Sequence, residues 1–284
     1  MAKRLEQLRE EYKNVPIPKE LDSIVEKALQ HRPKKKRIIM WPTSAAVAAA
    51  VLFTAIVNIN PCAAQAMSKI PVIGKVVQAI TFVEIKEEKD QSSIHVKTPA
   101  LSGLSNHELE NSINQKYLKE SKQLYQEFMK ATSKKNKEKW HLNVYSNYET
   151  VTDTPDLISI RRDIQLYGNT QSRYITIDKK NESLLTLKSL FKDDRYIKVI
   201  SQNIKEQMKK QMKEDPDKTY WFTDEDIAPF KKIHADQNFY ITEHHKLVIS
   251  FDKYEVAPGY MGVTKFEIPT SVISNLLVGN RYIR

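Results

Sequence analysis

The sequence is poor in the residues on which most recognisable catalytic motifs depend. It contains one cysteine, Cys62, and six glycines among 284 residues. A single cysteine excludes an intramolecular disulfide framework, and neither a phosphate-cradling glycine loop nor a G-x-S-x-G nucleophile elbow is present. The seven histidines are scattered, without the helical H-E-x-x-H pair of a zinc protease. We therefore predict that the protein is not an enzyme and needs neither a cofactor nor a metal ion.

One acidic segment is the nearest approach to a pair of catalytic carboxylates. It surrounds residues 220–222 and comprises Asp215, Asp217, Asp224, Glu225 and Asp226. A glycosidase needs two carboxylates at a defined separation, whereas a solvated loop uses Asp side chains to cap its own backbone. We interpret the segment as such a loop.

The net charge of +10 does not indicate a nucleic-acid-binding protein. Residues 1–66 contain 11 Lys and Arg against 6 Asp and Glu, and the totals of 45 and 35 leave 34 against 29 for the rest of the chain. The excess is thus divided, +5 in each part, and no basic stripe interleaved with aromatic residues is present. We predict no nucleic-acid partner.

A long stretch without charge divides the chain. No Asp, Glu, Lys or Arg occurs from residue 38 to residue 68, and the apolar part matches the roughly 20 residues of a membrane-spanning helix. A buried core helix is the alternative, but such helices rarely run this long without charge. Basic residues precede the stretch, which places the N-terminus in the cytoplasm and the C-terminus outside. They are Arg32, Lys34, Lys35, Lys36 and Arg37.

We therefore predict a single-pass protein of the cell membrane with four parts. They are a cytoplasmic tail (1–37), a transmembrane helix (38–58), a juxtamembrane segment (59–80) and an extracellular domain (81–284).

The span also has the features of a secretory signal peptide. A basic segment, an apolar run and an Ala-x-Ala site follow one another, with Ala64 and Ala66 at the minus 3 and minus 1 positions before Met67. Cleavage between Ala66 and Met67 would release the extracellular part, and an uncleaved anchor is the alternative. The alanine-rich span would ease the unwinding that an intramembrane protease requires, although small residues also serve helix packing.

The cytoplasmic tail carries two short amphipathic patterns. Leu5, Leu8 and Tyr12 recur at helical spacing, and a second apolar face follows Pro18. A tail of this length cannot bury both faces alone, so we predict that it folds against a protein partner. A loosely ordered tether is the alternative. The second face consists of Leu21, Ile24, Val25, Ala28 and Leu29.

The juxtamembrane segment has apolar residues at helical spacing, namely Ile70, Ile73, Val77 and Ile80. The pattern indicates a helix on the membrane surface, which could hide Ala66 from a protease. Burial of the same side chains in the core of the outer domain explains the pattern equally well.

The extracellular domain is predicted to be α+β, with an antiparallel sheet and helices packed on one face. Ser105 and Glu108 have the spacing of a capping box for a helix that runs to residue 131, and a second helix is predicted over 195–212. Strands are predicted over 94–97, 140–150, 157–167, 172–178, 239–242, 247–254 and 262–268.

One loop in this domain has the composition of a recognition site. It spans residues 257–262 between two predicted strands, and Pro258 and Gly259 favour a tight turn there. Tyr260 on such a rigid loop would lose little rotamer entropy on binding. An ordinary hairpin turn with an inward-packed tyrosine is the alternative.

Several longer motifs, spread over essentially the whole chain, together resemble one family. They are V-P-I-P-K-E-L-D-S-I-V-E-K-A-L in the tail, N-I-N-P-C-A-A-Q-A-M-S-K-I-P-V-I-G-K after the span, and T-P-A-L-S-G-L-S-N and F-D-K-Y-E-V-A-P-G-Y-M-G-V-T in the outer domain. In combination they resemble the RsiV-like family of membrane-bound anti-sigma factors that serve as lysozyme receptors. Where that family has N-P-D-A-A-Q-A, Cys62 replaces the aspartate and the Ala-x-Ala site is unchanged.

The resemblance implies a signalling role. The tail would hold an extracytoplasmic-function sigma factor inactive. The outer domain, related to modules fused to polysaccharide deacetylases, would bind lysozyme through Pro258, Gly259 and Tyr260 and the region 168–174. Binding would let signal peptidase cut after Ala66, and a site-2 intramembrane protease would then release the sigma factor. The alternative function is that of a membrane-anchored cell-wall enzyme or accessory module that acts on peptidoglycan or polysaccharide.

Charge opposes this encounter at long range, because animal-type lysozymes are strongly basic and the outer domain carries +5. Affinity must then come from shape and from local acidic or aromatic groups. Added salt should weaken binding little or even strengthen it.

Overall fold

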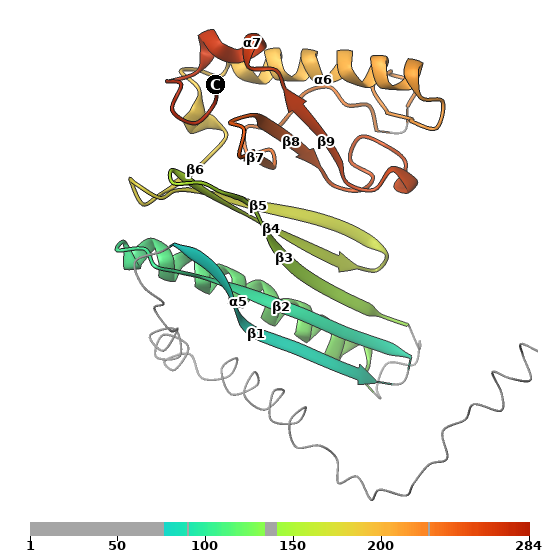
Figure 1. Cartoon of the computed structure of the whole chain (residues 1–284). Helices are drawn as coiled ribbons and strands as arrows, with labels where there is room; N and C mark the ends of the chain where they lie inside the picture. The colour runs from blue at the N-terminus through green and yellow to red at the C-terminus, as the bar shows by residue number, and fades with distance from the viewer. Residues whose placement is uncertain (1–76, 90, 134–140, 227) are drawn as a thin grey trace, which may run out of the picture. The chain divides into compact units, whose positions relative to one another are not determined.

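The computed structural model describes residues 77–89, 91–133, 141–226 and 228–284 (Figure 1). All described residues belong to one compact unit. The predicted tail, the predicted span and the predicted cleavage site at Ala66 therefore lie outside the described residues. Within the described ranges, no helix is both long and apolar enough to cross a membrane.

A six-stranded sheet forms the first part of the described fold, with its strands in sequence order from β1 to β6. Neighbouring strands are antiparallel except β2 and β3, which are parallel. A parallel pair needs a crossover connection, and the helix α5 (His107–Ala131) supplies it. The strands are β1 (Gln78–Lys89), β2 (Ser92–Ser102), β3 (Asn143–Asp153), β4 (Leu157–Leu166), β5 (Asn169–Asp178) and β6 (Ser183–Leu185).

The helix α5 covers one face of this sheet because its apolar residues recur on one side (Figure 1). Five of them are buried against the strands: Ile113, Tyr117, Leu118, Leu124 and Phe128. Asn106 caps the helix, since its side-chain oxygen accepts a hydrogen bond from the backbone N–H of Leu109 at 3.1 Å.

A second, three-stranded antiparallel sheet packs with the helix α6 (Arg195–Glu214). Its strands are β7 (Phe239–Ile241), β8 (Leu247–Phe251) and β9 (Thr264–Ile268). The buried side of α6 carries Tyr196, Ile200, Ile204 and Met208 in the largest apolar cluster, together with side chains of all three strands. The short helices are η1 (Lys188–Leu190), η2 (Gly259–Met261), α7 (Thr270–Ile273) and η3 (Ser274–Leu276).

Specific contacts join the two sheets. Tyr174 of β5 stacks on Tyr240 of β7 with ring centroids 5.2 Å apart, and the Thr152 hydroxyl donates to the carbonyl oxygen of Ile241 at 2.5 Å. Arg173 of β5 forms an ion pair of 2.6 Å with Asp252, which follows β8. The two sheets thus share contacts at β3 and at β5, the strand that carries one of the loops described below.

The α+β class is confirmed, but four details of the prediction are wrong. There are two sheets instead of one, and the first is mixed because the chain crosses over through α5 between β2 and β3. Asn106, not Ser105, caps the helix. The proposed juxtamembrane helix does not extend to Ile80, which lies in β1, and Val77 is buried in the core of the domain.

A charged side chain on β4 lies fully inside this fold. Arg162 of β4 has no exposed area, and its guanidinium donates to Ser146 Oγ at 3.0 Å and to Ser121 Oγ and Glu120 Oε2 at 2.7 Å each. Burial lowers the pKa of Arg162, because a low-dielectric environment disfavours its charged form. These bonds attach α5 to the sheet and fix the position of Glu120.

Candidate binding surface

The hairpin between β4 and β5 presents an exposed tyrosine. Leu166 pairs with Asn169, so the connection has two residues, Tyr167 and Gly168, with φ of 51° and 74°. Positive φ at both positions is the signature of a type I′ turn, whose twist matches that of the flanking strands. The Tyr167 side chain is held at the tip of a tight turn and is 62% exposed.

The loop between β8 and β9 presents a second tyrosine with its hydroxyl held in place. Tyr260 is 67% exposed, and its hydroxyl lies 2.9 Å from both the Asp217 carbonyl oxygen and Thr219 Oγ1. The ring therefore faces solvent while its far end is fixed, and the alternative of an inward-packed tyrosine is wrong. A fixed aromatic ring loses little conformational entropy when a partner covers it.

A third tyrosine, Tyr254, lies against Gly259. A Cβ atom at Gly259 would lie 2.3 Å from ring atoms of Tyr254, closer than real Cβ contacts. Tyr254 is 53% exposed, and the ammonium group of Lys253 lies 5.0 Å from the centre of its ring. Gly262 ends the loop with a φ of 63° and a ψ of −145°, a conformation open only to glycine.

Hydrogen bonds tie the two loops together. Lys253 Nζ donates to the Gly168 carbonyl oxygen at 3.0 Å, and the Lys253 backbone N–H donates to the Thr170 carbonyl oxygen at 3.3 Å. We refer to Tyr167, Tyr254 and Tyr260 as the tyrosine surface. The sequence singled out Tyr260 as a candidate binding residue, but not Tyr167 or Tyr254. The tyrosine–glycine pair at the end of the predicted strand 157–167 was the available signal for Tyr167.

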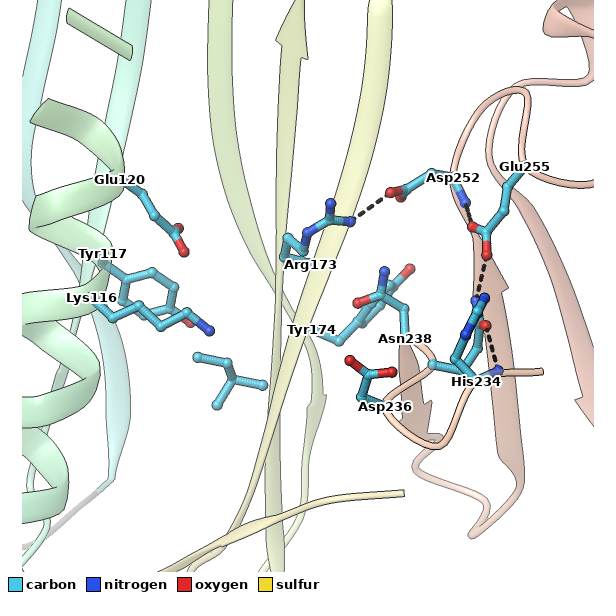
Figure 2. Close-up of a pocket in the computed structure, with 12 residues that line it drawn as sticks. Lys116, Tyr117, Glu120, Arg173, Tyr174, His234, Asp236, Asn238, Asp252 and Glu255 are labelled. Atoms are coloured by element: carbon cyan, nitrogen blue, oxygen red, sulfur yellow. Dashed lines mark hydrogen bonds and ion pairs between the residues drawn. The ribbon is translucent and has the colours of Figure 1, made fainter. Parts of the chain in front are cut away.

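A cavity of about 620 Å³ lies beside these loops, where β5 passes between α5 and the segment before β7. Figure 2 shows Lys116, Tyr117 and Glu120 on the α5 side, Arg173 and Tyr174 on β5, and the other labelled side chains opposite. Those opposite are His234, Asp236, Asn238, Asp252 and Glu255. A second cavity of about 450 Å³ is lined by Glu120, Glu127 and Tyr167, among others.

The acidic segment around residues 220–222 behaves as a capped loop. Asp226 Oδ2 accepts hydrogen bonds from the backbone N–H groups of Phe222 at 2.8 Å and Thr223 at 2.7 Å. The bond from the Thr223 backbone, followed by that from its hydroxyl, lowers the pKa of Asp226. No group of three His, Cys, Asp or Glu side chains able to hold a metal ion occurs in the described part of the chain.

Comparison with known proteins identifies the family. The anti-sigma-V factor RsiV of Bacillus subtilis (strain 168) is 80% identical over 287 residues, which cover 100% of this chain and 100% of that protein. This chain belongs to the RsiV family of anti-sigma factors. The family described as deacetylase PdaC matches residues 85–168, and the family of unknown function DUF3298 matches residues 188–271.

Two solved structures of the DUF3298 family are similar to this chain, and the first supports the α+β fold. One from Pseudomonas aeruginosa PAO1 has a TM-score of 0.52 and 12% identity, and the match covers 74% of this chain and 98% of that chain. Another from Bacteroides fragilis has a TM-score of 0.48 and 14% identity, with 72% and 95% covered. At such low identity the first of these likenesses bears on the fold alone.

The remaining predicted site residues stay predictions. The sigma-factor-binding face of the tail and the residues Ala64, Ala66 and Met67 precede the described part of the chain. Pro258, Gly259 and Tyr260 lie in the loop that also carries Tyr254, and Lys253 joins this loop to the hairpin that carries Tyr167.

Proposed function

We propose that this anti-sigma factor of the RsiV family is a lysozyme receptor controlled by proteolysis. Residues 1–37 hold an extracytoplasmic-function sigma factor at the cytoplasmic face of the cell membrane. Residues 38–58 cross the membrane, and the domain after residue 80 lies outside. Lysozyme on the tyrosine surface exposes the bond after Ala66 to signal peptidase, and a site-2 intramembrane protease then frees the sigma factor.

The held ring of Tyr260 is the observation that carries the extracellular half of this proposal. Binding energy at protein interfaces concentrates in a few aromatic anchors, and Tyr is enriched among them. Tyr260 combines an exposed ring with a hydroxyl fixed by Asp217 and Thr219. Tyr167 and Tyr254 place two further exposed rings on the linked loops, and exposed aromatic rings of this kind suit a protein partner.

Replacement of Ala66 by Trp tests the proteolytic step. Signal peptidase requires small residues at the minus 1 and minus 3 positions, so lysozyme added to cells with the A66W chain should release no extracellular domain. N-terminal sequencing of the domain shed by the native chain should begin at Met67. Gln65→Trp, at the unrestricted minus 2 position, is the matched control and should still be cut.

Two results would contradict the proposal. Lysozyme-dependent shedding of the A66W chain at the same bond would remove Ala66 from the mechanism. Release of the sigma factor from an intact, uncut chain would remove proteolysis altogether.

A further inference from the structure

The two cavities beside the tyrosine surface adjoin one another along α5 and β5. Glu120 lines both of them, and Tyr167 lines the second. We call this the acidic groove and define it by its five carboxylates. They are Glu120, Glu127, Asp236, Asp252 and Glu255.

Negative charge exceeds positive charge in the acidic groove. Among the lining residues, Lys116 and Arg173 are the cations that stand against the five carboxylates. Arg173 is already paired with Asp252, and Glu120 accepts from the buried Arg162. The groove therefore keeps an excess of negative charge even when both of its arginine ion pairs are counted.

Two of the carboxylates are open to a ligand. Glu127 on α5 and Asp236 before β7 are exposed and have no ion-pair partner within the described ranges. The side-chain oxygen of Asn169, on the wall of the second cavity, is buried and accepts no hydrogen bond from the described residues. An open carboxylate or amide oxygen is an acceptor for the N–H groups of lysine and arginine.

We propose that the acidic groove receives lysine or arginine side chains of a strongly basic protein partner while the tyrosine surface covers its apolar part. The inference rests on the proposed lysozyme-receptor function and specifies how a basic partner is held. The bonds of Arg162 to Ser121 and Ser146 hold α5 against the sheet, so the groove needs no rearrangement on binding. Preorganised groups lose less entropy when a complex forms.

The groove also removes the conflict between the charges of the two proteins. At long range, the +5 of residues 67–284 repels a basic partner. At contact, the unpaired carboxylates lie within about one Debye length of the partner's cations. The excess negative charge of the groove then outweighs the diffuse positive charge of the rest of the domain. Because attraction and repulsion offset each other, salt should change the affinity of the native chain little.

The test neutralises the two open carboxylates and measures binding as a function of salt. The full chain in detergent micelles is titrated with hen egg-white lysozyme, at about 50 mM and about 300 mM salt. Glu127→Gln and Asp236→Asn should each weaken binding about 3-fold to 10-fold at low salt, as expected for exposed ion pairs at an interface. The weakening relative to the native chain should shrink at high salt. Glu243→Gln, an exposed carboxylate outside both cavities, should leave the dissociation constant unchanged.

The outcomes separate the inference from the function on which it rests. If the native chain binds lysozyme and both neutral variants bind equally well, the groove is not part of the interface, and the receptor function stands. A loss of affinity that is the same at both salt concentrations would also contradict the inference, because salt must screen an effect of charge. If the native chain binds no lysozyme, both the proposed function and the inference about the groove are wrong.

Discussion

At the residue scale, the ring and the hydroxyl of Tyr260 have different roles. The ring offers apolar area to a partner, while the hydroxyl, held by Asp217 and Thr219, keeps the ring in place before binding. Loss of the ring removes contact area, whereas loss of the hydroxyl alone removes the preorganisation. Substitutions of Tyr260 can therefore measure the two contributions separately.

Tyr260→Ala should weaken lysozyme binding by on the order of 1 to 3 kcal/mol, the cost of truncating an aromatic anchor. Tyr260→Phe should cost less, about 1 kcal/mol, because the ring remains and only the net contribution of a hydrogen bond is lost. Isothermal titration calorimetry with the full chain measures both. Tyr145→Ala, an exposed tyrosine on β3, is the control and should have no effect. Equal affinity of native and Y260A chains would exclude Tyr260 from the interface.

At the element scale, the long helices were the most predictable parts of the fold and the sheet pairing the least. The second helix was expected over 195–212 and is observed as Arg195–Glu214, because its 3.6-residue pattern is long and strong. The parallel pairing of β2 and β3 was missed, since periodicity reports which face of a strand is buried and not which strand lies beside it.

In the candidate site, Tyr260 was singled out through its Pro-Gly context. Tyr254 was missed because its proximity to Gly259 depends on the folded loop.

The start of α5 shows why an N-cap can be misplaced by one residue. Ser105 and Asn106 are both good capping residues, and the sequence alone favoured Ser105 through its spacing to Glu108. In the fold, Glu182 accepts hydrogen bonds from the backbone N–H groups of both residues, at 2.9 Å and 2.5 Å. These bonds, with that from the Ser105 N–H first, lower the pKa of Glu182, and they leave the Asn106 side chain to cap the helix.

Asn106→Ala should therefore destabilise the domain by about 1 kcal/mol, the usual cost of an N-cap truncation. Ser105→Ala should change the free energy of unfolding by less than about 0.5 kcal/mol, as for an ordinary surface substitution. Thermal unfolding of the two variants, followed by circular dichroism at neutral pH, compares them directly. A larger loss for Ser105→Ala than for Asn106→Ala would reverse the assignment of the cap.

At the scale of the whole domain, a buried carboxylate joins the end of β5 to the C-terminal segment. Asp178 has no exposed area. Its oxygens accept hydrogen bonds from the Tyr282 hydroxyl, from Arg281 Nη2 at 2.9 Å, and from the backbone N–H groups of Lys180 and Asn181 at 2.8 and 3.0 Å. Burial alone would raise the pKa of Asp178, but these donors together lower it. The ionised form is thus the one that the fold stabilises.

The contribution of Asp178 to stability should therefore depend on pH. A carboxylate with a lowered folded pKa contributes fully above its unfolded pKa of about 3.9, and the contribution is lost as the pH falls through the folded value. Asp178→Asn should cost about 1.5 to 3 kcal/mol at pH near 7, the range for hydrogen bonds to a charged group. The native and variant chains should then converge in stability in acid. Asp193→Asn, an exposed carboxylate bonded only to Arg195, should cost under about 1 kcal/mol at either pH. Chemical denaturation across the acid range measures the free energy of unfolding of each chain. If the stability difference between the native chain and Asp178→Asn persists undiminished in acid, Asp178 acts through its shape and not through its charge.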